Sequence, residues 1–154
     1  MKKMNLKDEV LFNIVSISYI SVSSLIEIYL SNKEANDILH KNEEPDTLSQ
    51  SVIIDSLIIG LPVDSVILMK SKDNTIIING YNEISIIYKF TCLGFALSNN
   101  RNIHKSWRGK KFSELDSLSQ NNIRNYTMRS VLIEKKFDEN TCIYAEDLVE
   151  RYRK

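Results

Sequence analysis

The sequence predicts an α/β fold: a small mixed sheet of about four strands with helices packed against it. The first observation is a set of β-branched runs, bounded by polar or glycine turns, at residues 10–20, 63–70, 75–78 and 126–136. The second is that apolar helical patterns alternate with these runs, most clearly at residues 48–59 and 82–97. The third is a pair of turns, at Gly60 and Gly80, which separate helix from strand and strand from helix.

One domain accounts for the chain. A length of 154 residues suffices to bury roughly two-thirds of the unfolded surface, and we assign residues 10–154 to a single domain after a flexible N-terminus, residues 1–9. Twenty Lys and Arg balance twenty Asp and Glu, so net charge favours neither nucleic acid nor a membrane surface as partner. The longest apolar span, residues 52–69, contains two aspartates and a proline, which excludes a membrane helix.

The N-terminus and the cysteines indicate a cytoplasmic protein. The first residues are charged, but no small-residue cleavage site follows their apolar run. The two cysteines, Cys92 and Cys142, form no CxxC pair. We expect Cys92 to be a small buried hydrophobe, and a disulfide between the two is disfavoured without a sign of secretion.

In the first half of the chain, residues 10–20 predict a strand, or the end of a helix followed by a strand. Ser24 and Glu27 have the spacing of a capping box, so a short helix is expected over residues 24–31, with Leu25, Ile28 and Tyr29 on one face. Residues 32–46 are polar and predict a loop with at most one helical turn. Thr47 and Gln50 form a second capping box, which opens a largely buried helix that ends at Gly60.

In the second half, residues 63–70 and 75–78 predict two strands of a hairpin, the second of them central because it is β-branched throughout. A helix over residues 82–97 is expected to turn Ile84, Ile87, Tyr88, Cys92, Phe95 and Ala96 inward. Ser113 is expected to cap a helix that ends near residue 122. A strand over 126–136, a turn at 138–140 and a helix over 142–153 complete the chain.

The turn between the second hairpin strand and the next helix is the first candidate site. Backbone amides at such a helix start can hold an anion, and this indicates a ligand site made by Asn79, Gly80, Tyr81 and Asn82. Glu83 opposes an anion there. The alternative is that Asn79 and Gly80 form only a tight turn, since glycine supplies the backbone freedom.

The segment 98–111 is the second candidate site. It contains His104 and no acidic residue, and the side chains suited to nucleic acid are Arg101, Lys105, Trp107, Arg108, Lys110 and Lys111. The cations could contact a phosphate backbone while the indole stacks on a base. The alternative is a solvated loop with Trp107 packed on the domain.

The residues give no indication of catalysis, a metal or a cofactor. His40 and His104 have no His, Cys or carboxylate at metal-ligand spacing. No nucleophile–base spacing and no GxxxxGK[ST] loop is present.

Several motifs occur in the order found in a known family. They are Ser51-Val-Ile-Ile-Asp-Ser56, Gly60-Leu61-Pro62, Ile78-Asn79-Gly80, Gly109-Lys-Lys-Phe-Ser-Glu-Leu115 and, more loosely, Val149-Glu-Arg151-Tyr. In this order the chain resembles, over residues 12–153, the ParB/sulfiredoxin-like domain of the GmrS half of GmrSD-type modification-dependent restriction systems. The resemblance implies that fold, and nucleotide binding or hydrolysis with a divalent metal at the Asn79–Gly80 turn.

The chain departs from the family at the residues that carry chemistry. Asn79 stands at the motif aspartate, and Tyr81, Asn82 and Glu83 stand at Gln-Gln-Arg. Asn79 lacks the carboxylate that a metal or a base would need, and Glu83 repels a triphosphate. No catalytic residue is therefore carried over from the family, which indicates a pseudo-enzyme.

Three functions remain open from the sequence. The first is a non-catalytic protein-interaction module, such as an inhibitor or decoy encoded by a phage or mobile element, or a regulatory subunit of a defence-type complex. The second is nucleic-acid binding through residues 101–111. The third is a residual nucleotide-binding or NTP-hydrolysing domain. A protein partner is expected, with nucleic acid as the alternative partner and no membrane; the oligomeric state is left open.

Overall fold

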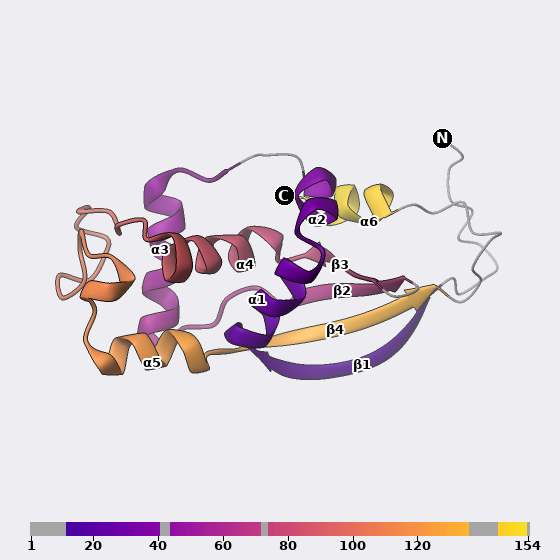
Figure 1. Ribbon diagram of the computed structural model, residues 1–154, viewed down its shortest axis with the longest axis horizontal. Helices are drawn as coiled ribbons and strands as arrows, with labels where there is room; N and C mark the ends of the chain where they lie inside the picture. Colours follow the sequence, from indigo (N-terminus) through magenta and orange to yellow (C-terminus); the bar gives the residue numbers. More distant parts are fainter. Residues whose placement is uncertain (1–11, 41–43, 72–73, 136–144, 154) are drawn as a thin grey trace.

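The computed structural model describes residues 12–40, 44–71, 74–135 and 145–153 and confirms the predicted fold class (Figure 1). Strands and helices are interspersed along the chain. In order they are β1 (Phe12–Ser21), α1 (Val22–Ser31), α2 (Lys33–His40), α3 (Thr47–Ile59), β2 (Val66–Ser71), β3 (Asn74–Asn79), α4 (Tyr81–Tyr88), α5 (Ser117–Asn125), β4 (Thr127–Lys135) and α6 (Ala145–Tyr152). A π-helical turn, η1 (Lys89–Leu93), follows α4, and a 3₁₀ turn, η2 (Phe112–Glu114), precedes α5.

The four strands form one mixed sheet in the order β1-β4-β2-β3. β4 pairs parallel with β2 and antiparallel with β1, while β2 and β3 form the predicted antiparallel hairpin. The prediction that residues 75–78 are central is wrong, because β3 is an edge strand. Its β-branched run reflects burial instead: Ile77 and Ile78 belong to hydrophobic cores on opposite faces of the sheet.

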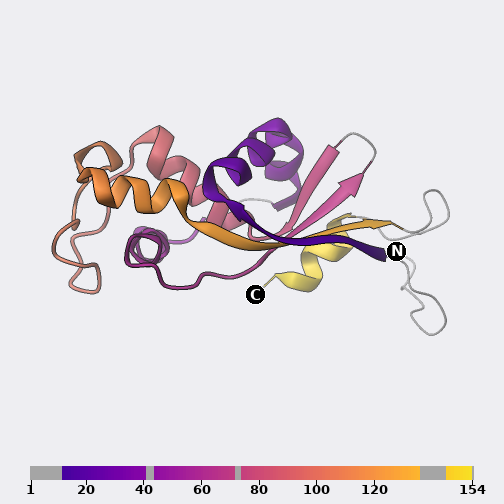
Figure 2. The same cartoon turned by 90° about the horizontal axis from the view of Figure 1, so that it is seen from below.

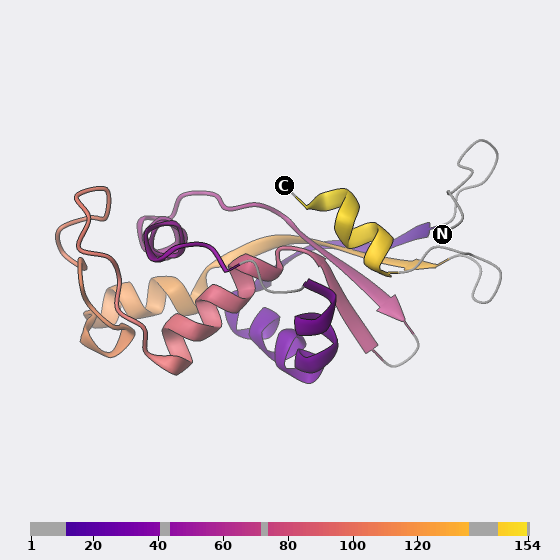
Figure 3. The ribbon, with the colours of Figure 1, turned by 90° about the horizontal axis from the view of Figure 1, so that it is seen from above.

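The two faces of the sheet are covered unequally. Figures 2 and 3 place α1 and α2 on one side and α6 on the other. The main core lies on the first side and joins α1, α3 and α4 to the sheet through residues such as Leu25, Leu57 and Ile87. On the second side Leu148 and Val149 of α6 pack against Met69 and Ile78. α6 therefore covers the β2–β3 half of its face.

The helix starts differ from the predicted ones. The capping residues are Ser21, Asp46 and Asp116, whose side chains accept hydrogen bonds from the amides of Ser24, Ser49 and Ser119. The predicted caps at Ser24, Thr47 and Ser113 are wrong, by three residues, one residue and three residues. In each case a Ser or Asp within three residues of the predicted cap has the same capping chemistry, before it at Ser21 and Asp46 and after it at Asp116. Sequence spacing alone therefore did not identify the start of the helix.

Three predictions of burial or helix extent are also corrected. Residues 32–46 are not mainly loop, because α2 occupies 33–40. The predicted 82–97 helix ends at Gly94, and Cys92 and Ala96 are exposed rather than inward. α3 is only half buried, with Val52 and Ile59 exposed.

Some predictions fall outside the described residues. These concern the N-terminal residues 1–9, part of the turn between β2 and β3, the turn at 138–140, and Cys142 with any disulfide that it could form. Among the described residues, no helix has the length and apolar character that crossing a membrane requires.

Candidate functional site

The predicted ligand residues Asn79, Gly80, Tyr81 and Asn82 line one pocket of about 390 Å³. The pocket lies where β3 passes into α4, and segments distant in sequence complete it. The other lining residues are His40, Glu44, Pro45, Asp64, Ile78, Glu83, Val149, Tyr152 and Arg153. Ile78 and Glu83 adjoin the predicted turn, and Glu83 was considered there. Sequence reasoning missed the others, and no local signal could have found them, because they come from α2, from α6 and the residue after it, and from the segments before α3 and β2.

Gly80 sets the geometry of the turn. Its φ of 97° lies in the left-handed region, and a Cβ there would stand 3.0 Å from Cγ2 of Val66. Gly80 leaves the first turn of α4 without a side-chain cap. The side-chain Nδ2 of Asn79 donates to the carbonyl of Ser65 at 3.0 Å. This hydrogen bond joins the last residue of β3 to the residue before β2, as expected of a structural turn.

A carboxylate behind the pocket holds Tyr81. Oδ1 of Asp37 accepts from the hydroxyls of Tyr81 at 2.6 Å and Tyr29 at 3.0 Å, and Oδ2 accepts from Lys33 at 2.6 Å. Burial works to raise the pKa of Asp37, but the bonds from Lys33, Tyr81 and Tyr29 lower it overall. Burial and the bond to Asp37 raise the pKa of both tyrosines. Asp37 is therefore ionised at neutral pH and fixes the Tyr81 ring.

His40 forms the aromatic wall of the pocket together with Tyr81. The two rings stack at 4.3 Å with an interplanar angle of 3°. The Nε2 of His40 lies 2.5 Å from the carbonyl oxygen of Ile77, to which it donates. Burial lowers the pKa of His40, although the bond to Ile77 raises it. The ring is thus neutral at neutral pH.

The charges around the pocket disfavour a phosphate. Its lining carries the carboxylates of Glu44, Asp64 and Glu83 and one guanidinium, that of Arg153. Arg153 bonds Glu150 at 3.0 Å, and Glu44 forms an ion pair with Lys89. Like charges at close range repel, so a polyanion would meet an unfavourable field here. A small neutral ligand stacked on the aromatic wall suits this lining better.

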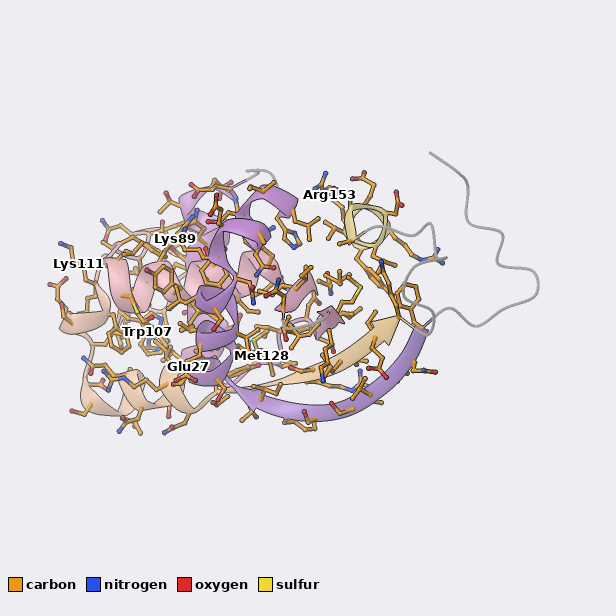
Figure 4. The ribbon with its side chains drawn as sticks, turned by 45° about the vertical axis from the view of Figure 1, so that its right-hand side comes forward. Glu27, Lys89, Trp107, Lys111, Met128 and Arg153 are labelled. Carbon is orange, nitrogen blue, oxygen red and sulfur yellow. The ribbon has the colours of Figure 1, made fainter. Side chains whose placement is uncertain are left out.

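The predicted nucleic-acid residues lie on a separate surface. Figure 4 places Trp107 and Lys111 at the end of the molecule away from Arg153 and the pocket. The indole of Trp107 donates to Oδ1 of Asp55 in α3 at 2.7 Å, and His104 stacks on it at 4.5 Å. Trp107 is thus packed on the domain.

The arginines and lysines of segment 98–111 divide into two groups. The guanidinium of Arg108 donates to the carbonyls of Ile103 at 2.5 Å and Arg101 at 2.9 Å, so it holds the loop together. The hydroxyl of Ser51 in α3, which is buried, accepts from the amide of Ser98 at 2.9 Å and so ties the start of the segment to this helix. Among the described residues of the segment the remaining cations, Arg101, Lys105, Lys110 and Lys111, are exposed.

The two edges of the sheet differ, and sequence reasoning missed this difference. At the β3 edge, α2 satisfies the backbone of Ile77: Asn36 accepts from its amide at 2.9 Å, and His40 donates to its carbonyl. Asn32 also donates to the carbonyl of Thr75 at 3.4 Å. At the β1 edge, no hydrogen bond among the described residues reaches the outer backbone groups.

β1 is also apolar on the outside. Its large exposed side chains are Ile14, Val15, Ile17 and Tyr19. Over its ten residues it contains no charge and no proline. The sequence showed a long strand in which apolar residues and serines alternate without charges. Only the topology of the sheet shows that this strand lies at an edge.

Among the described residues, no group of three or more His, Cys, Asp or Glu is placed to hold a metal ion. Comparisons of the chain with family models, curated proteins and solved structures find no match.

Proposed function

We propose that the chain is a non-catalytic protein-interaction module that binds its partner along β1. One observation carries the proposal: among the described residues nothing bonds the outer edge of β1, which is apolar, whereas the β3 edge is closed by Asn32, Asn36 and His40. An exposed edge strand presents unpaired amides and carbonyls to which an extended segment of a partner can add.

The composition of β1 strengthens this reading. Proteins usually protect an exposed edge with lysine, proline or an inward charge, and β1 has none of these in the sequence FNIVSISYIS. Ile17 and Tyr19 are 55% and 72% exposed. A partner strand would remove such apolar side chains from water, which is favourable.

The resemblance to the ParB/sulfiredoxin-like domain of GmrSD-type systems gives this proposal its context. Gly60-Leu61-Pro62 and Ile78-Asn79-Gly80 stand in the family's order, while Tyr81, Asn82 and Glu83 replace the residues that would act on a nucleotide. On this reading the chain is a degenerate domain acting in the cytoplasm, as a phage or mobile-element inhibitor or decoy or as a regulatory subunit of a defence-type complex.

Affinity capture from a lysate of the encoding organism tests the proposal. Wild-type protein is compared with Tyr19→Lys, which places a charge on β1, and with Ile38→Lys as a control. Ile38 lies on α2 and is 62% exposed, so the control adds the same charge at a similarly exposed apolar site. A protein retained by wild type and control but lost with Tyr19→Lys supports the proposal. If no captured protein depends on Tyr19, the proposal is wrong.

A second candidate function is small-ligand binding in the pocket above Gly80. One observation favours it: the four predicted ligand residues and the His40–Tyr81 stack line the same pocket of about 390 Å³. Calorimetry with the four ribonucleoside triphosphates and magnesium tests the nucleotide form of this candidate. The carboxylates in the lining lead us to expect nucleosides to bind better than triphosphates, and background heat for both sets would remove it.

A further inference from the structure

We infer that the strand taken up by β1 is the β1 of a second copy of this chain. The two sheets then join across a two-fold axis into one continuous sheet. This inference rests on the proposed function, since it names the partner of the same edge. Three observations support it: the register of β1 against β4, the absence of charge in β1, and the closed β3 edge.

The register places three apolar side chains on one face. Ile14, Ile17 and Tyr19 lie opposite Ile133, Val131 and Arg129 of β4. Directly opposed residues point to the same side of a sheet. Val131 and Ile133 in turn lie opposite Ile67 and Met69 of β2, the side on which α6 packs. Ile14, Ile17 and Tyr19 therefore form a row on the α6 face, along the margin that α6 leaves open.

Val15 makes this row possible. It is the extra residue of a β-bulge, because the register passes from Ile14–Ile133 directly to Ser16–Leu132. Without the bulge, Ile14 and Ile17 would point to opposite faces, since their positions differ by an odd number. The bulge returns both to the same side.

The row is self-complementary under a two-fold axis. An antiparallel pairing of two β1 strands centred on Ile17 places this residue opposite its own copy and Ser16 opposite Ser18. If each bulge is kept, Tyr19 of one copy then lies opposite Ile14 of the other, and Phe12 lies opposite Ser21. All residues of β1 except the bulged Val15 then have a partner in the other copy. Aromatic and β-branched side chains are favourable cross-strand neighbours.

Charge and topology support a second copy. In a two-fold interface a residue at the axis meets its own copy and every other residue meets a residue of the same strand, so a strand of like charges would repel itself. β1 carries no charge. Figure 1 shows β1 at the margin of the described part of the molecule, with no described helix or strand beyond it. The β3 edge is occupied by α2, so pairing ends at two copies rather than continuing into a fibre.

The size of the seam predicts a weak, reversible dimer. Ten extended residues span about 33 Å, and one strand pair with a single row of side chains buries less than the roughly 1,600 Å² of a standard stable interface. We therefore expect monomer and dimer to exchange with concentration.

Sedimentation equilibrium of the purified chain, from micromolar to millimolar concentration, tests the inference. Wild type should dimerise, and Ile17→Lys should weaken the dimer at least about tenfold, because two like charges would face each other at the axis. Ile38→Lys is the matched control and should behave as wild type. Mixing Ile17→Lys with Ile17→Glu should restore a dimer, since the charges at the axis are then opposite. Circular dichroism checks that each variant is folded; Ile17 is exposed, so folding should be retained.

The outcomes separate this inference from the proposed function. A wild type that stays monomeric throughout, or a dimer that Ile17→Lys leaves unchanged, overturns the pairing of two copies. The proposed function survives that result if another protein is still captured in a Tyr19-dependent manner. Dimerisation that is lost with Ile17→Lys and recovered in the Lys–Glu mixture supports the pairing.

Discussion

Replacing Asn36 with alanine tests the idea that α2 closes one edge of the sheet. Asn36 is fully buried. Its Oδ1 accepts from the amide of Ile77 in β3 at 2.9 Å, and its Nδ2 donates to the carbonyl of Asn32 at 2.9 Å. Alanine keeps the helix but removes both bonds.

The two lost bonds have unequal consequences. The carbonyl of Asn32 keeps a donor, because the backbone amide of Asn36 also bonds it at 3.0 Å. The amide of Ile77 loses its acceptor, and Ile77 is fully buried. An unsatisfied buried donor costs about 1–3 kcal/mol. We therefore expect the free energy of unfolding to fall by about 2 kcal/mol, which corresponds to a decrease of about 4–8 °C in Tm for a domain of this size.

Urea unfolding followed by circular dichroism measures the loss. Asn121→Ala is the matched control, because Asn121 is exposed on α5 and the same replacement there removes no buried bond. We expect the control to change stability by less than about 0.5 kcal/mol. If Asn36→Ala loses no more than the control, then Asn36 does not hold β3, and the contrast between the two edges fails.

Three further predictions concern the pocket and the basic segment. Gly80→Ala should lower the free energy of unfolding by about 1–3 kcal/mol in the same assay, because alanine must adopt a left-handed φ and meet Val66; an unchanged urea midpoint would contradict this. Burial lowers the pKa of His40 below its usual 6.5, and the bond to Ile77 only partly opposes this shift. Its contribution to stability is therefore complete above about pH 6.5 and is lost as the pH falls towards the folded-state pKa; His40→Gln should reduce this dependence in urea titrations across that range. If segment 98–111 binds single-stranded DNA, neutralising Lys110 and Lys111 should lower the slope of log affinity against log salt by roughly 1.4; an unaltered slope, or no binding by wild type, rules out nucleic acid.

The turns were predictable because each depends on one residue and its neighbours. Gly60 and Gly80 both adopt positive φ, at the end of α3 and before α4. Glycine is the residue that does so without strain, so local chemistry determined both boundaries. The four strands were likewise found from local composition, with ends that differ by a few residues from the structure.

The walls of the pocket were not predictable, because they depend on packing between distant segments. α2 is polar on most of its surface and resembles a loop in composition. It is helical because Asn36 and His40 bond β3 and because Asp37 accepts a bond from Tyr81 of α4. These are tertiary bonds, and a local pattern contains no information about them.

The composition of a strand also does not determine whether the strand lies at the edge or in the centre of a sheet. β3 is β-branched and suggested a central strand, yet it is an edge that helices bury on both faces and α2 closes at the side. β1 is also an edge, but its outer side chains are exposed. Within the part of the chain that the structure describes, hydrogen bonds from a helix thus close the β3 edge and not the β1 edge. An open apolar edge carries a risk of aggregation, so its presence at β1 is best explained by a strand that occupies it.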